Sequence, residues 1–205
     1  MTITLERATS LQGTVRLPAD KAICHRAALL ASLIDGATEI TPWSTSQDCQ
    51  HTLAVLEGLG VQITRLAEGI RVQGVGLAGL RAPSHALPCG ESGTTMRLAS
   101  GLLAGQPFES ELTAQGSLAQ RPMRRVIEPL SKMGAVIAGR QVGADVHPPL
   151  RIQGRRPLRG IRYELSLASA QVKTAILLAG LSADGPTTVV EPLATRDHTE
   201  RLLRR

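Results

Sequence analysis

One pattern occurs three times along the chain: an apolar helical run, a glycine turn and a β-branched run. The turn glycines are Gly36, Gly105 and Gly185, at intervals of 69 and 80 residues. A second helix and a closing pair of strands follow the first two turns, whereas the third copy stops within its second helix. Repeats of this kind cannot bury their apolar faces singly, so they must pack on one another.

The pattern predicts units of the order strand, helix, strand, helix and two strands. We place three units at about 17–80, 81–157 and 158–205, with the third incomplete. An unfinished unit exposes surface meant for a partner. We therefore expect the chain to be part of a longer protein.

The first helix of each unit is apolar or small on nearly every side. These helices are expected over Arg26–Ile34, Thr95–Ala104 and Ser169–Leu181. A surface helix carries a polar stripe, so all three should be buried. We predict an inside-out, barrel-like α/β (α+β) fold, with three sheets outside and three parallel helices inside, about a pseudo-threefold axis. The alternative is a layered α/β fold with its helices outside.

Composition favours small anionic ligands over nucleic acid. The net charge is +6, but the basic residues are scattered and only three aromatic residues are present for base stacking. Twenty of the 23 basic residues are arginine, whose guanidinium suits bidentate contacts to carboxylate and phosphate. With 42% apolar residues and so few aromatics, the core must be aliphatic.

The remaining residue types exclude several classes of protein. Cys24, Cys49 and Cys89 form no C-x-x-C pair and are odd in number, which indicates buried thiols in a reducing compartment. No signal peptide or apolar run of about 18 residues occurs, so we expect a soluble, cytoplasmic protein without a membrane partner. The five histidines lack the spacing of metal ligands, and we expect no metal.

The segments that precede the three buried helices combine helix-capping residues or glycines with a cation. Helix N-termini attract anions because their first N–H groups are unpaired and the helix dipole is positive there. If three units surround one axis, these helix starts meet on one face. Taken singly, each segment could be an ordinary helix cap or a solvated helix face. Together they predict a cleft for several phosphate or carboxylate groups, with these cations: Lys21, Arg26, Arg97 and Arg121.

The same segments resemble the 5-enolpyruvylshikimate-3-phosphate synthase family of enolpyruvyl transferases. The resemblance covers essentially the whole chain but only the first half of such an enzyme. It lies in these segments: Leu17–Arg26, Gly90–Arg97, Gln120–Met123, Ala168–Lys173 and Thr195–Glu200. The resemblance implies two domains of three βαβαββ units. Residues 17–205 would be the N-terminal substrate-binding domain, 1–16 a strand segment that belongs to the second domain, and the second domain itself would be absent.

In this family the enolpyruvyl group of phosphoenolpyruvate is transferred to the 5-hydroxyl of shikimate 3-phosphate, and phosphate is released. The resemblance therefore implies a shikimate-pathway enzyme of aromatic amino acid biosynthesis that needs no cofactor and is a monomer when complete. The acid/base carboxylates belong to the other domain of the family. We expect the missing C-terminal domain to be this chain's partner, and the chain to be inactive alone.

The resemblance also assigns site residues. Lys21 is the catalytic residue and meets both substrates. The phosphoenolpyruvate contacts are Lys21, Gly93 and Arg121. The shikimate 3-phosphate contacts are Lys21, Ala22, Arg26, Ser169, Gln171 and Arg196. Further candidates are Glu91, Thr94, Arg97 and Ala170.

Two positions depart from the family pattern. Ala22 stands where a serine hydroxyl usually contacts substrate, and Glu91 puts a carboxylate where a neutral amide usually meets phosphoenolpyruvate. Two alternatives are open. A UDP-N-acetylglucosamine enolpyruvyl transferase shares the repeats but has a different lysine motif, and a non-catalytic module would bind anions or nucleic acid.

Overall fold

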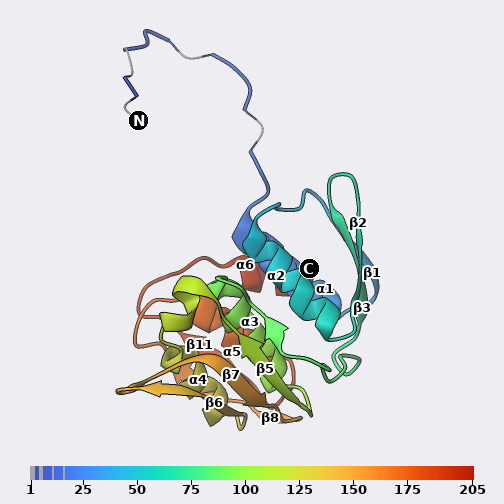
Figure 1. Cartoon of the computed structure of the whole chain (residues 1–205), viewed down its shortest axis with the longest axis vertical. Coiled ribbons are helices and arrows are strands. Elements are labelled where there is room, and N and C mark those ends of the chain that lie inside the picture. Colours follow the sequence, from blue (N-terminus) through green and yellow to red (C-terminus); the bar gives the residue numbers. More distant parts are fainter. Residues whose placement is uncertain (1–2, 5–6, 11, 16) are drawn as a thin grey trace.

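The computed structural model describes residues 3–4, 7–10, 12–15 and 17–205 (Figure 1). The described residues before position 21 form no helix or strand. The expected strand at 1–16 is therefore absent from the described part of that segment, and its remaining positions lie outside the described residues.

Three successive units follow. The first consists of α1 (Lys21–Ser32), β1 (Asp35–Ile40), α2 (Gln47–Gly58), β2 (Gln62–Arg65) and β3 (Ile70–Val75). Its strands form an antiparallel sheet of order β1-β3-β2.

The second unit has the same order with one strand more. It consists of β4 (Leu87–Pro88), α3 (Gly93–Ala104), β5 (Glu109–Thr113), the 3₁₀ helix η1 (Gly116–Gln120), α4 (Arg124–Lys132), β6 (Val136–Val142) and β7 (Asp145–Gln153). The sheet order is β4-β5-β7-β6, in which β4 runs parallel to β5 and the other pairs are antiparallel.

The third unit stops after its second helix. It consists of β8 (Leu158–Arg159), β9 (Arg162–Glu164), α5 (Ala170–Gly180), β10 (Ala183–Asp184), β11 (Thr188–Val190) and α6 (His198–Leu203). The parallel pairs β8–β10 and β9–β11 flank α5 in sequence. From α1 onward the first two units follow the predicted order, whereas the third has two short strands on each side of α5 where one was predicted.

The first helix of each unit is buried, as predicted. In α3, ten of the twelve residues are buried, and α3 packs against both α1 and α5. Each of the three helices also contacts strands of its own unit: β1 and β3 for α1, β5 and β7 for α3, and β11 for α5. A layered fold with all helices outside is therefore wrong, and the pseudo-threefold relation stays a prediction.

Close packing between α3 and α5 depends on one glycine. A Cβ atom added at Gly101 would lie 2.2 Å from the carbonyl oxygen of Ala175. Real Cβ atoms do not approach an oxygen this closely, so the two helix backbones touch only because position 101 has no side chain. The core around them is aliphatic, and Trp43, Phe108 and Tyr163 pack at its margin, half-buried.

Candidate active site

The three buried helices all begin with a side-chain cap. Asp20 Oδ1 accepts a hydrogen bond from Ile23 N at 2.8 Å, and Ser92 Oγ accepts one from Thr95 N at 3.1 Å. In α5, Ser169 Oγ accepts one from Val172 N at 3.3 Å. Each cap satisfies one of the N–H groups that a helix start leaves without an intrahelical partner.

Side chains connect these three first turns directly. Arg26 donates through Nη1 to Ala22 O (2.8 Å) and through Nη2 to Ala170 O (3.4 Å), which joins α1 to α5. Gln171 Nε2 donates to Thr94 Oγ1 at 2.8 Å, and Arg97 Nη1 donates to Gln171 Oε1 at 3.0 Å, which joins α5 to α3. The predicted meeting of the helix starts is confirmed, and their positive dipole ends reinforce one another there.

Arg26 is held deep in this junction. Its side chain is among the buried ones, at 3% exposure for the residue. Its Nε donates to Thr199 Oγ1 (2.8 Å) and to Thr174 Oγ1 (3.2 Å). Burial lowers the pKa of Arg26, and the nearby charge of Arg196 lowers it further. Arg196 itself is exposed, so the structure sets an accessible guanidinium close to a buried one.

A second pair of guanidinium groups lies at the start of α3. A Cβ atom added at Gly93 would lie 2.7 Å from Arg97 Nη1 and 3.4 Å from Arg121 Nη1. Burial lowers the pKa of Arg97, and the charges of Arg125 and Arg121 lower it further. The bare first turn of α3 therefore faces several cations, an arrangement that suits a phosphate or a carboxylate.

The carboxylate of Glu91 is hydrogen-bonded to the 3₁₀ helix η1. Its Oε2 accepts a hydrogen bond from Ser117 N at 3.0 Å, and Arg121 Nη2 donates to Ser117 Oγ at 3.2 Å. Hydrogen bonds from Ser117 hold the pKa of Glu91 below its ordinary value, and Arg121 adds to that effect. The carboxylate thus helps to fix the segment that carries Arg121.

Lys21 is paired with a residue that sequence reasoning missed. Its Nζ lies 2.6 Å from Asp48 Oδ2, at the start of α2, and the lysine side chain is half exposed. An aspartate in a first helical turn is common, so no sequence signal distinguished Asp48. The pair places a carboxylate directly beside the predicted catalytic ammonium.

A chain of buried hydrogen bonds links the first, second and third helices through a histidine and two threonines. His25 Nδ1 lies 2.6 Å from Thr52 Oγ1, which lies 2.8 Å from Thr95 Oγ1. Thr95 Oγ1 in turn donates to Asp48 O at 3.1 Å. The chain joins α1, α2 and α3, and sequence reasoning missed it because its members are far apart in the sequence.

Ser169 and Gln171 lie at the α5 start, and Ala22 and Lys21 at the α1 start. The structure therefore brings the predicted residues of α1, α3 and α5 together at the helix starts. Arg121 lies in the loop before α4, and Arg196 lies in the loop before α6. Whether each one contacts substrate stays a prediction.

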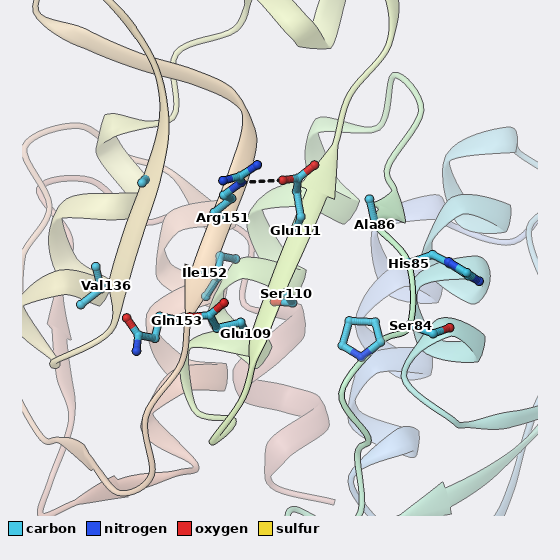
Figure 2. Close-up of a pocket in the computed structure, with 12 residues that line it drawn as sticks. Ser84, His85, Ala86, Glu109, Ser110, Glu111, Val136, Arg151, Ile152 and Gln153 are labelled. Atoms are coloured by element: carbon cyan, nitrogen blue, oxygen red, sulfur yellow. Dashed lines mark hydrogen bonds and ion pairs between the residues drawn. The ribbon is translucent and has the colours of Figure 1, made fainter.

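A groove of about 600 Å³ lies elsewhere. It is formed by the loop at 83–86 and by residues of β5, β6 and β7 (Figure 2). Glu111 and Arg151 form an ion pair of 2.8 Å in it. None of the predicted site residues lines this groove.

The described residues include no helix that is both long and apolar enough to cross a membrane. In the same part of the chain, no three His, Cys, Asp or Glu side chains gather as they would around a metal ion. All three cysteines are buried and unpaired, as predicted.

The fold is that of an α/β domain, and its helix ends have the charge and free N–H groups that suit an anion. Residues 5–205 match the model of a family described as EPSP synthase (3-phosphoshikimate 1-carboxyvinyltransferase), and the chain belongs to this family. The predicted family is thus confirmed.

Similar proteins bear the same name. The 3-phosphoshikimate 1-carboxyvinyltransferase of Methylococcus capsulatus is 52% identical over 94% of this chain and 44% of its own length. That of Alkalilimnicola ehrlichii is 53% identical over 95% of this chain and 43% of its own length. The solved EPSP synthase of Acinetobacter baumannii has a TM-score of 0.89 and 45% identity, over 94% of this chain and 43% of that one. The chain therefore spans less than half the length of these relatives.

Proposed function

We propose that this chain forms the substrate-binding surface of a 3-phosphoshikimate 1-carboxyvinyltransferase. The reaction transfers the enolpyruvyl group of phosphoenolpyruvate to the 5-hydroxyl of shikimate 3-phosphate and releases phosphate. The observation that carries the proposal is the junction of three helix starts, linked through Arg26, Arg97 and Gln171. Both substrates carry several negative charges, which this junction can stabilise.

The two substrates would occupy neighbouring parts of the junction. Phosphoenolpyruvate would lie at the start of α3, where Gly93 lets the guanidinium groups of Arg97 and Arg121 approach. Shikimate 3-phosphate would lie between α1 and α5, near Ser169, Gln171 and the exposed Arg196. Lys21 would act between them, where its ammonium can stabilise charge that develops in the tetrahedral intermediate.

We propose that the proton transfers depend on the rest of a longer protein. The relatives are more than twice as long as the part this chain matches. Two carboxylates beside the junction are already engaged, Asp48 by Lys21 and Glu91 by Ser117. A C-terminal domain would then supply the acid and base groups and close the cleft, in a monomeric cytoplasmic enzyme of aromatic amino acid biosynthesis.

Titration calorimetry with shikimate 3-phosphate tests the proposal. We expect the wild-type chain to bind it, and Arg196→Met to weaken the affinity by about tenfold or more, because a charge-assisted contact to the phosphate is lost. Arg71→Met is the matched control, since Arg71 pairs with Glu39 on the first sheet, away from the junction. A folded wild-type chain that gives no heat at millimolar ligand would contradict the proposal.

The net charge of +6 favours a second candidate, a non-catalytic module that binds nucleic acid. Such a module would bind an oligonucleotide with an affinity that falls steeply with salt, because phosphate contacts release counterions. We expect no such binding. Oligonucleotide binding with that salt dependence, without binding of shikimate 3-phosphate, would replace the transferase proposal by this one.

A further inference from the structure

A buried lysine on α5 holds two carboxylates from the end of the chain. The Lys173 side chain is 5% exposed, and its Nζ lies 2.7 Å from Glu191 Oε2 and 2.6 Å from Glu200 Oε1. Glu191 follows β11 and Glu200 belongs to α6. We call Lys173, Glu191 and Glu200 the carboxylate clamp. A buried ammonium is costly unless it is paired, and here it has two partners.

The carboxylate clamp encloses the segment that carries Arg196. Glu191 also accepts a hydrogen bond from Thr195 Oγ1, one residue before Arg196. Main-chain hydrogen bonds occur at the two ends of this segment, from Leu165 N to Val190 O and from Arg201 N to Asp197 O. Between these ends, the contacts of Glu191 fix the backbone near Arg196.

A second attachment fixes the far end of the segment. Thr199 Oγ1 accepts from Arg26 Nε at 2.8 Å and lies 2.6 Å from Thr174 Oγ1, so the start of α6 is tied to α1 and α5. Glu200 adds the bond to Lys173, one turn above Ser169 on α5. Its other oxygen, Oε2, is buried and has no hydrogen-bond partner in the described part of the chain.

The contacts on both sides of Arg196 have an electrostatic reason. Arg196 lies close enough to Arg26 for the two like charges to interact unfavourably. Without a ligand between them, this repulsion opposes the placement of Arg196 beside Arg26. The carboxylate clamp acts against this repulsion through contacts on both sides of Arg196 in the sequence.

We propose that Lys173 is a positioning residue that, through Glu191 and Glu200, holds Arg196 beside Arg26 ready for the phosphate group of shikimate 3-phosphate. The inference rests on the proposed function for its ligand. Lys173 touches no substrate in this role, since its ammonium is occupied by the two carboxylates. A purely structural lysine would instead affect all ligands of the junction alike.

Two measurements on the full 205-residue chain separate these roles. The variant Lys173→Met keeps the side-chain length and removes the charge. We expect amide hydrogen exchange at 193–198 to rise about tenfold, while the buried amides of α3 keep their protection. We expect the affinity for shikimate 3-phosphate to fall about tenfold, with the affinity for phosphoenolpyruvate unchanged.

Three further variants serve as controls. Lys132→Met removes a lysine that pairs with Glu128 at 3.1 Å on the exposed face of α4, and it should change neither measurement. Lys173→Arg keeps a cation between the two carboxylates and should restore binding to within about threefold of wild type. Glu191→Gln leaves Glu200 to neutralise Lys173, so this variant should fold even if Lys173→Met does not. Its affinity for shikimate 3-phosphate should fall by about threefold.

The outcomes are distinct. Normal exchange at 193–198 and normal shikimate 3-phosphate affinity in Lys173→Met, or in Glu191→Gln if the first variant is unfolded, overturn the inference. An equal loss of affinity for both substrates also overturns it and shows a structural role. If the wild-type chain does not bind shikimate 3-phosphate, the proposed function fails together with the ligand part of the inference. Hydrogen exchange then still decides whether Lys173 orders the segment.

Discussion

At the scale of single residues, the site depends on side-chain groups that are absent as well as on its cations. Gly93 contributes no side chain, and two guanidinium groups use the space it leaves. Ala22 contributes a methyl group where the family pattern has a hydroxyl, while its carbonyl oxygen receives Arg26. Glu91 contributes a charge, but one that hydrogen bonds from Ser117 engage.

Replacing Gly93 by alanine should weaken phosphoenolpyruvate binding by about tenfold. The new methyl group would displace Arg97 Nη1, which lies 2.7 Å from its position, and would press on Arg121. Calorimetry with each substrate measures the effect, and shikimate 3-phosphate should bind almost as before. Gly13→Ala is the control, because a methyl group there meets no described atom within 4 Å. Unchanged phosphoenolpyruvate affinity in Gly93→Ala would contradict the assignment of this subsite.

Restoring a hydroxyl at position 22 should tighten binding of shikimate 3-phosphate. One additional hydrogen bond is worth about 1 kcal/mol, or about fivefold in affinity. The measurement compares Kd for Ala22→Ser with that of wild type, and Ala54→Ser serves as control because Ala54 is a half-buried alanine of α2 outside the junction. Equal or weaker binding in Ala22→Ser would mean that the site around Ala22 has been rebuilt.

At the scale of elements, the packing of helix starts decides the chemistry. The buried helices were predictable, because α3 and α5 lack a polar stripe and a helix of that kind must lie inside. The ends of α3 and α5 were predicted to within two residues, whereas α1 begins at Lys21, five residues before the predicted start at Arg26. The strand β7 was harder to predict from the sequence, because it includes Pro148 and Pro149. Proline cannot donate to a ladder, and the pairing of β6 with β7 is irregular between Ala138 and Arg140, opposite this stretch.

The carboxylate clamp should make stability depend on pH at both extremes. Burial opposes the charge of Lys173, but the bonds to Glu191 and Glu200 raise its pKa above the ordinary 10.5. Burial likewise opposes the charge of Glu191, but Lys173 and Thr195 lower its pKa below the ordinary 4.5. The contribution of Lys173 is therefore complete below pH 10.5 and is lost as the pH rises through its folded-state pKa. That of Glu191 is complete above pH 4.5 and is lost as the pH falls through its folded-state pKa.

Denaturant unfolding of wild type and Glu191→Gln between pH 3 and pH 7 tests the acidic side. We expect the difference in free energy of unfolding to be constant above about pH 5 and to shrink below pH 4.5, where Glu191 binds a proton in the unfolded state before it does in the folded state. A difference that stays constant down to pH 3 would show that Glu191 gains nothing from Lys173.

At the scale of the whole molecule, hydrogen bonds join the starts of the three buried helices, and the strands of the first unit lie apart from β5, β6 and β7 (Figure 1). Under the proposed function, these helix starts form one wall of the binding surface. Catalysis of a charged transition state needs donors and cations fixed around it, with water excluded. The described residues provide cations and helix dipoles on one side, and under the proposed function the second wall belongs to the rest of the longer protein.

The 205-residue chain should therefore bind both substrates without converting them. Phosphate release measured with phosphoenolpyruvate and shikimate 3-phosphate together should equal the background without protein. A full-length relative, such as the Methylococcus capsulatus protein, is the positive control. Transfer by the short chain would show that the acid and base groups lie within it, and the division of roles proposed above would be wrong.

The sequence by itself determined the repeated units, the interior position of their first helices and the common location of their N-termini. These follow from local periodicity and from the need of each repeat to bury its apolar face. Only the tertiary structure decided the pairing of Lys21 with Asp48, the hydroxyl chain through Thr52 and Thr95, and the contacts of Lys173. These groups lie between 15 and 50 residues apart in the sequence. Their partnership depends on the distances and burial that packing creates, which no local pattern records.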